Sequence, residues 1–216
     1  METLAQQFLS KEQQKQVSET VHSVEKRTSG EIVPMIVSTS HHYPLATLIG
    51  ALALALPSAL LLSGLLARVI NMPAQNMWVF IALYGVFFPL FFVLIKKNPL
   101  LQIPFLFAPH VEEEVREGAI KAFYSEQLYK TRDENGILIY ISVFEKRVWI
   151  LGDRGIDAKI DQSRWDEIVA ELTEGIKTGN RCQSLCDAVS KVGLILEEFF
   201  PIQDDDPNEL HDLIVK

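Results

Sequence analysis

The chain has 216 residues, and its 20 lysines and arginines against 28 aspartates and glutamates give a formal net charge of −8. This balance excludes a typical nucleic-acid-binding protein, because neutralising phosphates requires clustered basic side chains. The mean hydropathy is nevertheless positive, +0.14, although 22% of the residues are charged. Apolar residues must therefore be concentrated in one part of the chain.

The first predicted elements are a helix and a strand. Ser10 and Gln13 form a capping box, and the valines that follow at helical spacing predict an amphipathic helix that reaches about Thr28. Residues 31–39, EIVPMIVST, are rich in β-branched side chains, which predicts a strand. Pro34 within this strand favours an edge or a bulge over a central position.

Two long apolar segments follow, at about residues 45–67 and 77–95. Each is long enough to cross a bilayer, which takes about 20 residues as a helix. Two buried core helices are the alternative, but little chain remains to cover helices that are apolar all round. Only a short segment, residues 71–76, separates the two, so we expect a tight hairpin whose flanks emerge on the same side.

Positive charges near the ends of the apolar segments predict the orientation. Lys96 and Lys97 follow the second segment directly, and Lys26 and Arg27 precede the first, whereas Arg68 beside the turn favours the opposite orientation. The first residues lack the apolar stretch of a secretory signal. These features predict a multi-pass protein of the plasma (inner) membrane, with its termini and soluble domain in the cytoplasm.

The chain after the apolar segments begins with a predicted linker and a helix. Residues 98–109 hold three prolines without helical periodicity, which predicts an irregular linker at the membrane interface. From Val111 the apolar spacing is helical, and acidic residues 112–114 lie where they stabilise the start of a helix. This acidic triplet therefore indicates a helix start rather than a metal site.

The remaining elements are a strand pair and two helices. Residues 137–143 and 147–151 are apolar runs joined by a charged turn, which predicts an antiparallel hairpin. A helix is expected to begin at Ser163, with Asp166 completing its cap, and a final helix spans about residues 181–200. Its two cysteines, Cys182 and Cys186, are expected to pack as small apolar groups, because further zinc ligands are missing nearby.

Several of these segments together resemble a known family. The run AFYSEQLYKTRDENGILIYISVFEKRVWILGDRGID (residues 122–157), followed by a helix that contains tryptophan, is similar to the TPM-domain family. The earlier segment GEIVPMIV (residues 30–37) resembles the family's first strand. The resemblance implies a compact α/β sandwich, found in bacterial membrane proteins and in thylakoid and animal membrane-associated proteins. Relatives have been connected with acid phosphatase activity, calcium binding, photosystem II repair and receptor regulation.

The predicted fold is an α/β, TPM-like three-layer sandwich with a two-helix transmembrane hairpin inserted after the first strand. An insertion of this kind is tolerated when its two ends lie close together. The predicted domains are residues 1–42 (first helix and strand of the TPM-like domain), 43–97 (hairpin), 98–200 (main part of the domain) and 201–216 (acidic tail).

Three aspartates after the second strand of the pair form the candidate metal site. Asp153, Asp157 and Asp161 lie four residues apart, and Asp133 and Glu134 are expected at the same end of the sheet. Calcium takes six to eight oxygen ligands, so these carboxylates with backbone carbonyls and water would form a weak site. The EF-hand spacing is absent. The alternative is a solvated turn shaped by Gly152 and Gly155, and the sequence favours this alternative.

The sequence favours a non-catalytic role, in which the domain is an interaction or assembly module for another membrane protein at the cytoplasmic surface of the lipid bilayer. The alternative is a metal-dependent, calcium-linked phosphatase that uses Asp153 and its acidic neighbours. It is less favoured because the sequence lacks P-loop, HExxH and GxSxG motifs, and the only D-x-D pattern, in residues 204–206, falls in the acidic tail. Transport is disfavoured because the two predicted spans contain no internal charge that could form an ion path.

Overall fold

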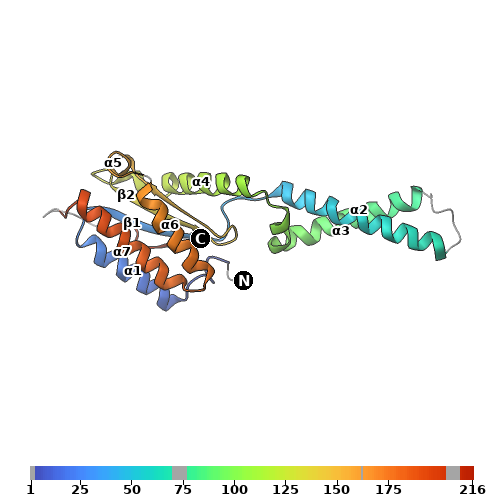
Figure 1. Ribbon diagram of the computed structural model, residues 1–216, viewed down its shortest axis with the longest axis horizontal. Helices are drawn as coiled ribbons and strands as arrows, with labels where there is room; N and C mark the ends of the chain where they lie inside the picture. The colour runs from blue at the N-terminus through green and yellow to red at the C-terminus, as the bar shows by residue number, and fades with distance from the viewer. Residues whose placement is uncertain (1–2, 70–76, 162, 203–209) are drawn as a thin grey trace. The chain divides into compact units, whose positions relative to one another are not determined.

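The computed structural model describes residues 3–69, 77–161, 163–202 and 210–216 (Figure 1). The chain forms two compact units. Residues 1–41 and 111–216 make up the first, which we call the α/β unit, and residues 42–110 make up the second, the hairpin unit. The α/β unit is therefore assembled from chain on both sides of the apolar segments.

A four-stranded sheet lies at the centre of the α/β unit, with the strand order β3-β2-β1-β4. β1 (Glu31–Val37) runs parallel to β2 (Gly136–Ser142) and to the two-residue β4 (Ile214–Val215), and β2 is antiparallel to β3 (Arg147–Gly152). Every residue of β1 and β2 is buried. This matches their nearly continuous apolar sequence, which is typical of strands covered on both faces.

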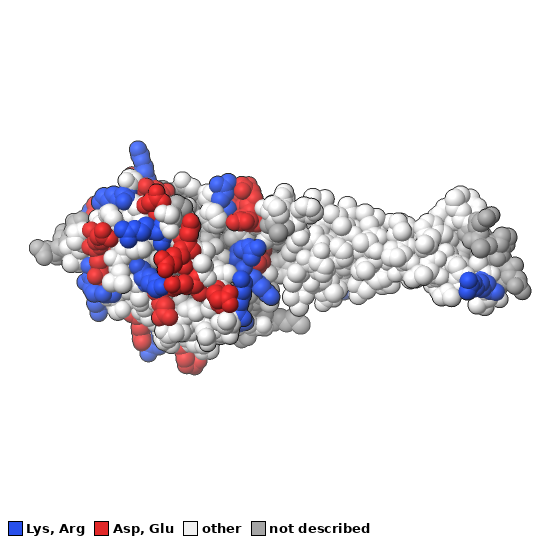
Figure 2. Space-filling model, viewed as in Figure 1, with Lys and Arg blue, Asp and Glu red and all other residues white. Residues whose placement is uncertain are grey.

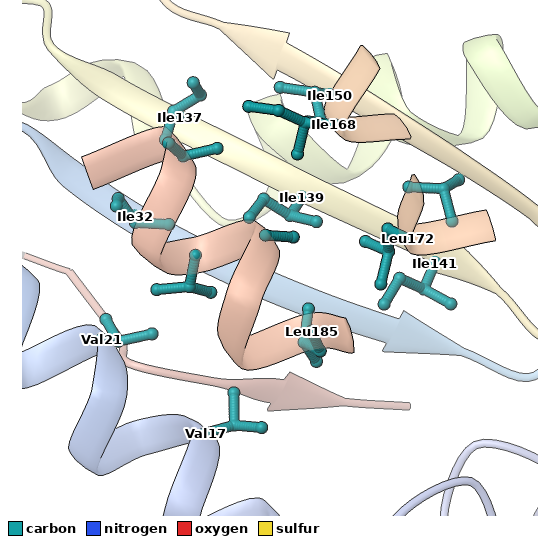
Figure 3. Packing of buried hydrophobic residues seen from close by; sticks show 14 of the residues in the cluster. Val17, Val21, Ile32, Ile137, Ile139, Ile141, Ile150, Ile168, Leu172 and Leu185 are labelled. Carbon is teal, nitrogen blue, oxygen red and sulfur yellow. The ribbon is translucent and has the colours of Figure 1, made fainter. Parts of the chain in front are cut away.

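One face of the sheet is covered by three helices, α1 (Lys11–Glu25), α6 (Ser163–Lys177) and α7 (Arg181–Phe199). Their apolar stripes pack against alternate side chains of the strands (Figure 3). The strand residues of this cluster include Ile32, Ile137, Ile139, Ile141 and Ile150. Cys182 and Cys186 also belong to it, as free buried thiols, so the prediction that they pack as apolar groups is confirmed.

The opposite face is covered by α4 (Ala108–Ser125), whose residues from Val111 onward belong to the α/β unit. Val115 and Ala119 of this helix are buried, as are Leu138 and Tyr140, which point away from the first cluster. A Cβ atom on Gly118 would lie 2.9 Å from the Tyr140 hydroxyl, so helix and sheet approach closely here. The predicted three-layer α/β arrangement is confirmed.

The start of α1 confirms the predicted capping box. The Ser10 hydroxyl accepts a hydrogen bond from the Gln13 backbone N–H at 3.2 Å, and the Gln13 side chain accepts one from the Ser10 N–H at 2.9 Å. Two N–H groups that a helix start leaves free are satisfied in this way.

The expectation that Pro34 marks an edge or a bulge is wrong, because β1 lies between β2 and β4. The Glu31 N–H bonds to the Asn135 carbonyl on the β2 side. By alternation, the nitrogen of Pro34 faces the β4 side, and β4 pairs with β1 only at Met35 and Ile36. The missing N–H of Pro34 therefore removes no bond from the ladder.

Five further features differ from the sequence predictions. The linker contains a 3-10 helix, η1 (Pro99–Phe105), and a second one, η2 (Leu128–Lys130), follows α4. A short helix, α5 (Arg154–Asp157), follows β3, and the C-terminal segment adds β4. Finally, the residue that caps α6 is Asp161, whose carboxylate accepts a hydrogen bond from the Ser163 N–H, rather than Ser163 itself.

The hairpin unit contains α2 (Pro44–Val69) and α3 (Met77–Lys97), which are both long and apolar enough to span a membrane. Their most apolar windows have mean hydropathies of 2.2 and 2.5, and only 6% of the α3 window is buried. Small residues of α2, Gly50, Ala51, Ala55 and Ala59, are buried, as at close-packed helix pairs in lipid. Figure 2 shows few charged side chains on this unit, in contrast to the α/β unit.

Candidate functional site: the acidic corner and the free edge of β3

The acidic corner lies where β3 ends and α5 begins. The Asp153 N–H bonds to the Gly136 carbonyl at 2.8 Å, which continues the ladder with β2, and the Asp153 carboxylate accepts a hydrogen bond from the Arg154 N–H at 2.7 Å. A Cβ atom on Gly155 would lie 2.6 Å from the Glu134 carbonyl oxygen, so only glycine fits there without movement. The chain before β2 and the chain after β3 therefore meet, as expected.

Asp153 is the buried member of this corner. Its side chain is 8% exposed, and its Oδ2 atom has no hydrogen-bond partner among the described residues. Burial raises the pKa of Asp153 above its usual value, and the nearby negative charge of Glu134 raises it further, although the hydrogen bond from Arg154 acts in the opposite direction. A buried carboxylate oxygen without a donor is costly, so this atom is suited to binding a cation or carrying a proton.

Of the other two predicted ligands, Asp157 lies near Asp153 and Asp161 does not. Partial burial raises the pKa of Asp157, and the charge of Asp153 raises it further. Asp161 instead caps α6, and its hydrogen bonds with Ser163 lower its pKa. The structure therefore brings together Asp153, Asp157 and Glu134, and it assigns Asp161 to the start of a helix.

The corner supplies only part of a cation site. Among the described residues, no group of three histidine, cysteine or acidic side chains is arranged to hold a metal ion. Asp153 and Asp157 would provide carboxylate oxygens, whereas a calcium ion needs about six to eight oxygen ligands. Backbone carbonyls and water would have to complete the shell, which corresponds to a weak site.

The remaining candidates from the sequence lie elsewhere. The Nδ1 atom of His41 lies 3.0 Å from a carboxylate oxygen of Glu114, next to the junction with the hairpin unit. The D-x-D pattern of residues 204–206 lies outside the described residues.

A second candidate site is the outer edge of β3, which the sequence did not reveal. β3 is the last strand on its side of the sheet. Because Asp153 bonds to Gly136, the alternation of an antiparallel ladder directs the N–H and C=O groups of Val148, Ile150 and Gly152 away from β2. In the described part of the chain, no residue hydrogen-bonds to these outward groups.

A hollow of about 200 Å³ lies along this free edge, within the α/β unit. Its lining combines residues of β3 with one turn of α4 and the outer face of α6, namely Glu112, Val115, Arg147, Val148, Trp149, Ile150, Asp166, Val169 and Thr173. Position in the sheet cannot be read from one strand's own sequence. The only local signal is Arg147, a basic residue of the kind that protects edge strands.

Comparisons with known proteins agree with this architecture. Residues 96–194 match the family model of the TPM domain. The NMR structure of the BA42 protein from the psychrophilic bacterium Bizionia argentinensis superposes with a TM-score of 0.59 at 22% identity, covering 96% of this chain and 94% of that one. That likeness shows the fold. No match was found among curated proteins. The resemblance noted in the sequence is thus confirmed, and residues 96–194 of the chain carry the match to the TPM domain.

Proposed function

We propose that this protein is a membrane-anchored interaction module, in which the hairpin unit holds the TPM domain at the surface of the bilayer and the domain binds another membrane protein. The observation that carries the proposal is the free edge of β3 beside its hollow. Exposed edges offer unpaired N–H and C=O groups to another chain, and proteins normally cover or blunt them.

The membrane part of the proposal rests on the surface of the hairpin unit. Large apolar side chains such as Leu61 and Trp78 are 69% and 75% exposed. Apolar surface of this extent marks a membrane or protein contact. Lys96 and Lys97 in the last turn of α3 favour a cytoplasmic α/β unit in the plasma (inner) membrane.

Photo-crosslinking in native membranes tests the module directly. A photoreactive phenylalanine in place of Arg147, which is exposed on β3, is expected to give a discrete adduct with one membrane protein. The same group in place of Lys177, exposed on α6 outside the hollow, is the matched control. Equal labelling from both positions, or no adduct from Arg147, would refute an interaction surface at this edge.

Cation binding is a second candidate, favoured by the unpartnered Oδ2 atom of buried Asp153. Asp153 and Asp157 would hold a divalent cation such as calcium, with Glu134 contributing negative charge nearby. A bound cation would supply the positive charge that a phosphatase-like hydrolase needs at phosphoryl oxygens. Cation binding is therefore the first requirement of that alternative function.

Asp153→Asn separates the effect of cation binding from the effect of the turn geometry, because asparagine retains a side-chain oxygen that caps α5. In chelator, this variant should be at least as stable as the parent at neutral pH. The raised pKa means that the folded state favours protonated Asp153. Protonation of Asp153 therefore stabilises the folded state below pH 3.8, and this stabilisation is lost as the pH rises through the raised pKa. The difference in melting temperature between parent and variant, measured across this range, checks the sign.

Calcium added at neutral pH should raise the melting temperature of the parent in a saturable way, and the shift should disappear in Asp153→Asn. Asp161→Asn is the matched control, because Asp161 belongs to the α6 cap and should leave the calcium response intact. A parent that does not respond, or that loses its response equally in both variants, would exclude a site at Asp153.

A further inference from the structure

We infer that the free edge of β3 binds an extended, basic segment of a partner protein, which adds to the sheet as a fifth strand. This inference rests on the proposed interaction module and names the chemistry of its ligand. The hollow is about 200 Å³, which is room for one or two side chains of a segment that lies along the edge. A helix with side chains is about 10–12 Å across, so an extended segment approaches the edge of a strand more closely than a helix does.

The backbone of β3 provides the hydrogen bonds. The outward N–H and C=O groups of Val148, Ile150 and Gly152 lie on alternate residues, as strand addition requires. An added strand would lie about 4.8 Å from β3, at the normal spacing of a sheet. β3 is a regular strand over all six of its residues, but Ile150 is only 1% exposed and Val148 6%, so side chains that line the hollow have to move before a partner strand reaches these backbone groups.

The walls of the hollow would contact alternate side chains of the added strand. Residues of an extended segment point in turn to the two faces of the sheet. On one face they would meet Val115 of α4 and the half-buried Trp149, and on the other Val169 and Thr173 of α6. Each face thus offers an apolar contact for one small side chain.

Charge identifies the ligand as basic. Glu112 lines the hollow on the α4 side and Asp166 on the α6 side, and both side chains are exposed. Within the described residues, neither carboxylate forms a salt bridge. Among the described residues that line the hollow, Arg147 is the single basic one, so this lining is acidic on balance. A segment that carries a lysine or arginine on each face would complement both carboxylates.

The probe is a fluorescein-labelled peptide of sequence Lys-Lys-Val-Val-Lys-Lys, which presents basic and apolar groups on both faces in either direction. Its binding to the full-length protein in detergent is measured by fluorescence anisotropy. We expect saturable binding that weakens with salt, and much weaker binding of Glu-Glu-Val-Val-Glu-Glu. Equal binding of the acidic peptide would overturn the inference.

Two N-methylated versions of the basic peptide test strand addition itself. Each is methylated on one alternate set of amides, so both keep the same side chains and charge. Only one set of amides faces β3 in an added strand, so one version should lose binding at least tenfold more than the other. Equal losses would show that side chains alone hold the peptide, which contradicts a fifth strand.

Variants of the protein test the charge. Glu112→Gln combined with Asp166→Asn should weaken binding of the basic peptide about fivefold, because exposed ion pairs contribute modestly. Glu174→Gln, an exposed change on α6 outside the hollow, is the control and should not alter binding. An unchanged affinity in the double variant would refute recognition by these carboxylates.

The photo-crosslinking experiment keeps this inference separate from the proposed function. An adduct at Arg147 with a membrane protein, together with failure of the basic peptide, retains the module and overturns the basic strand. An adduct of the chain with a second copy of itself would overturn both the foreign partner and the basic segment. Absence of both the adduct and peptide binding refutes the module and the inference together.

Discussion

Replacing residues 42–110 with a flexible linker should give a protein that folds and stays monomeric without detergent. The linker would have about eight glycine and serine residues, with a root-mean-square span of roughly 16 Å. The α/β unit holds its own core, and the residues that flank the excised segment, His41 and Val111, both belong to this unit. The intact chain, with its exposed apolar helices, should require detergent under the same conditions.

The ends of the excised segment are close because contacts within the α/β unit hold them. His41 lies 3.0 Å from Glu114 across the excision. The buried carboxylate of Glu145, in the turn between β2 and β3, accepts hydrogen bonds from the Thr39 hydroxyl at 3.0 Å and from the Ser40 N–H at 2.9 Å. Size-exclusion chromatography with light scattering and circular dichroism would check the excised protein. Aggregation or loss of its helical signal would contradict an independently folded α/β unit.

Ile139→Ala should destabilise the α/β unit by about 2–5 kcal/mol, the usual cost of removing a large buried aliphatic side chain. Ile139 is 0% exposed at the centre of β2 and packs under α6 and α7. For a unit of this size the loss corresponds to a fall in melting temperature of roughly 5–15 °C.

Leu194→Ala on α7 is the matched control, because this leucine is 60% exposed and its truncation should change stability by less than about 0.5 kcal/mol. Thermal unfolding of both variants in the same detergent provides the comparison. Similar melting temperatures for the two variants would mean that β2 is not at the centre of the core.

The elements that the sequence predicted well have local causes. The Ser10–Gln13 capping box starts α1 through bonds that span three residues, and the apolar run of β2 reflects burial on both faces. The hairpin of β2 and β3 has its signal in the charged turn between them. Such features depend on neighbouring residues, so the sequence alone carries them.

The features that were missed depend on distant parts of the chain. β4 has only two residues and is held by partners far away in sequence, including the bond from the Lys216 N–H to the Ile36 carbonyl. Pro34 removes no ladder hydrogen bond, because this short strand pairs with β1 only at Met35 and Ile36. The free edge of β3 likewise depends on strand order, which a single strand's composition does not encode.

The acidic corner likewise combines a feature with a local sequence signal and features that depend on distant parts of the chain. The sequence predicted that chain near Glu134 would meet chain near Asp153, because both lie at the same end of paired strands. The four-residue spacing suggested that Asp161 would join them, but the cap of α6 holds this residue instead. Burial of Asp153, which raises its pKa, depends on tertiary packing and has no local sequence signal.

Alkaline carbonate extraction of membranes from cells that express the intact chain tests most directly whether α2 and α3 anchor the TPM domain in a bilayer. Carbonate removes peripheral proteins and leaves spanning helices in place. We predict that the chain stays in the membrane pellet and is released only by detergent. Recovery of the intact chain as a monomer in the carbonate supernatant would contradict the account.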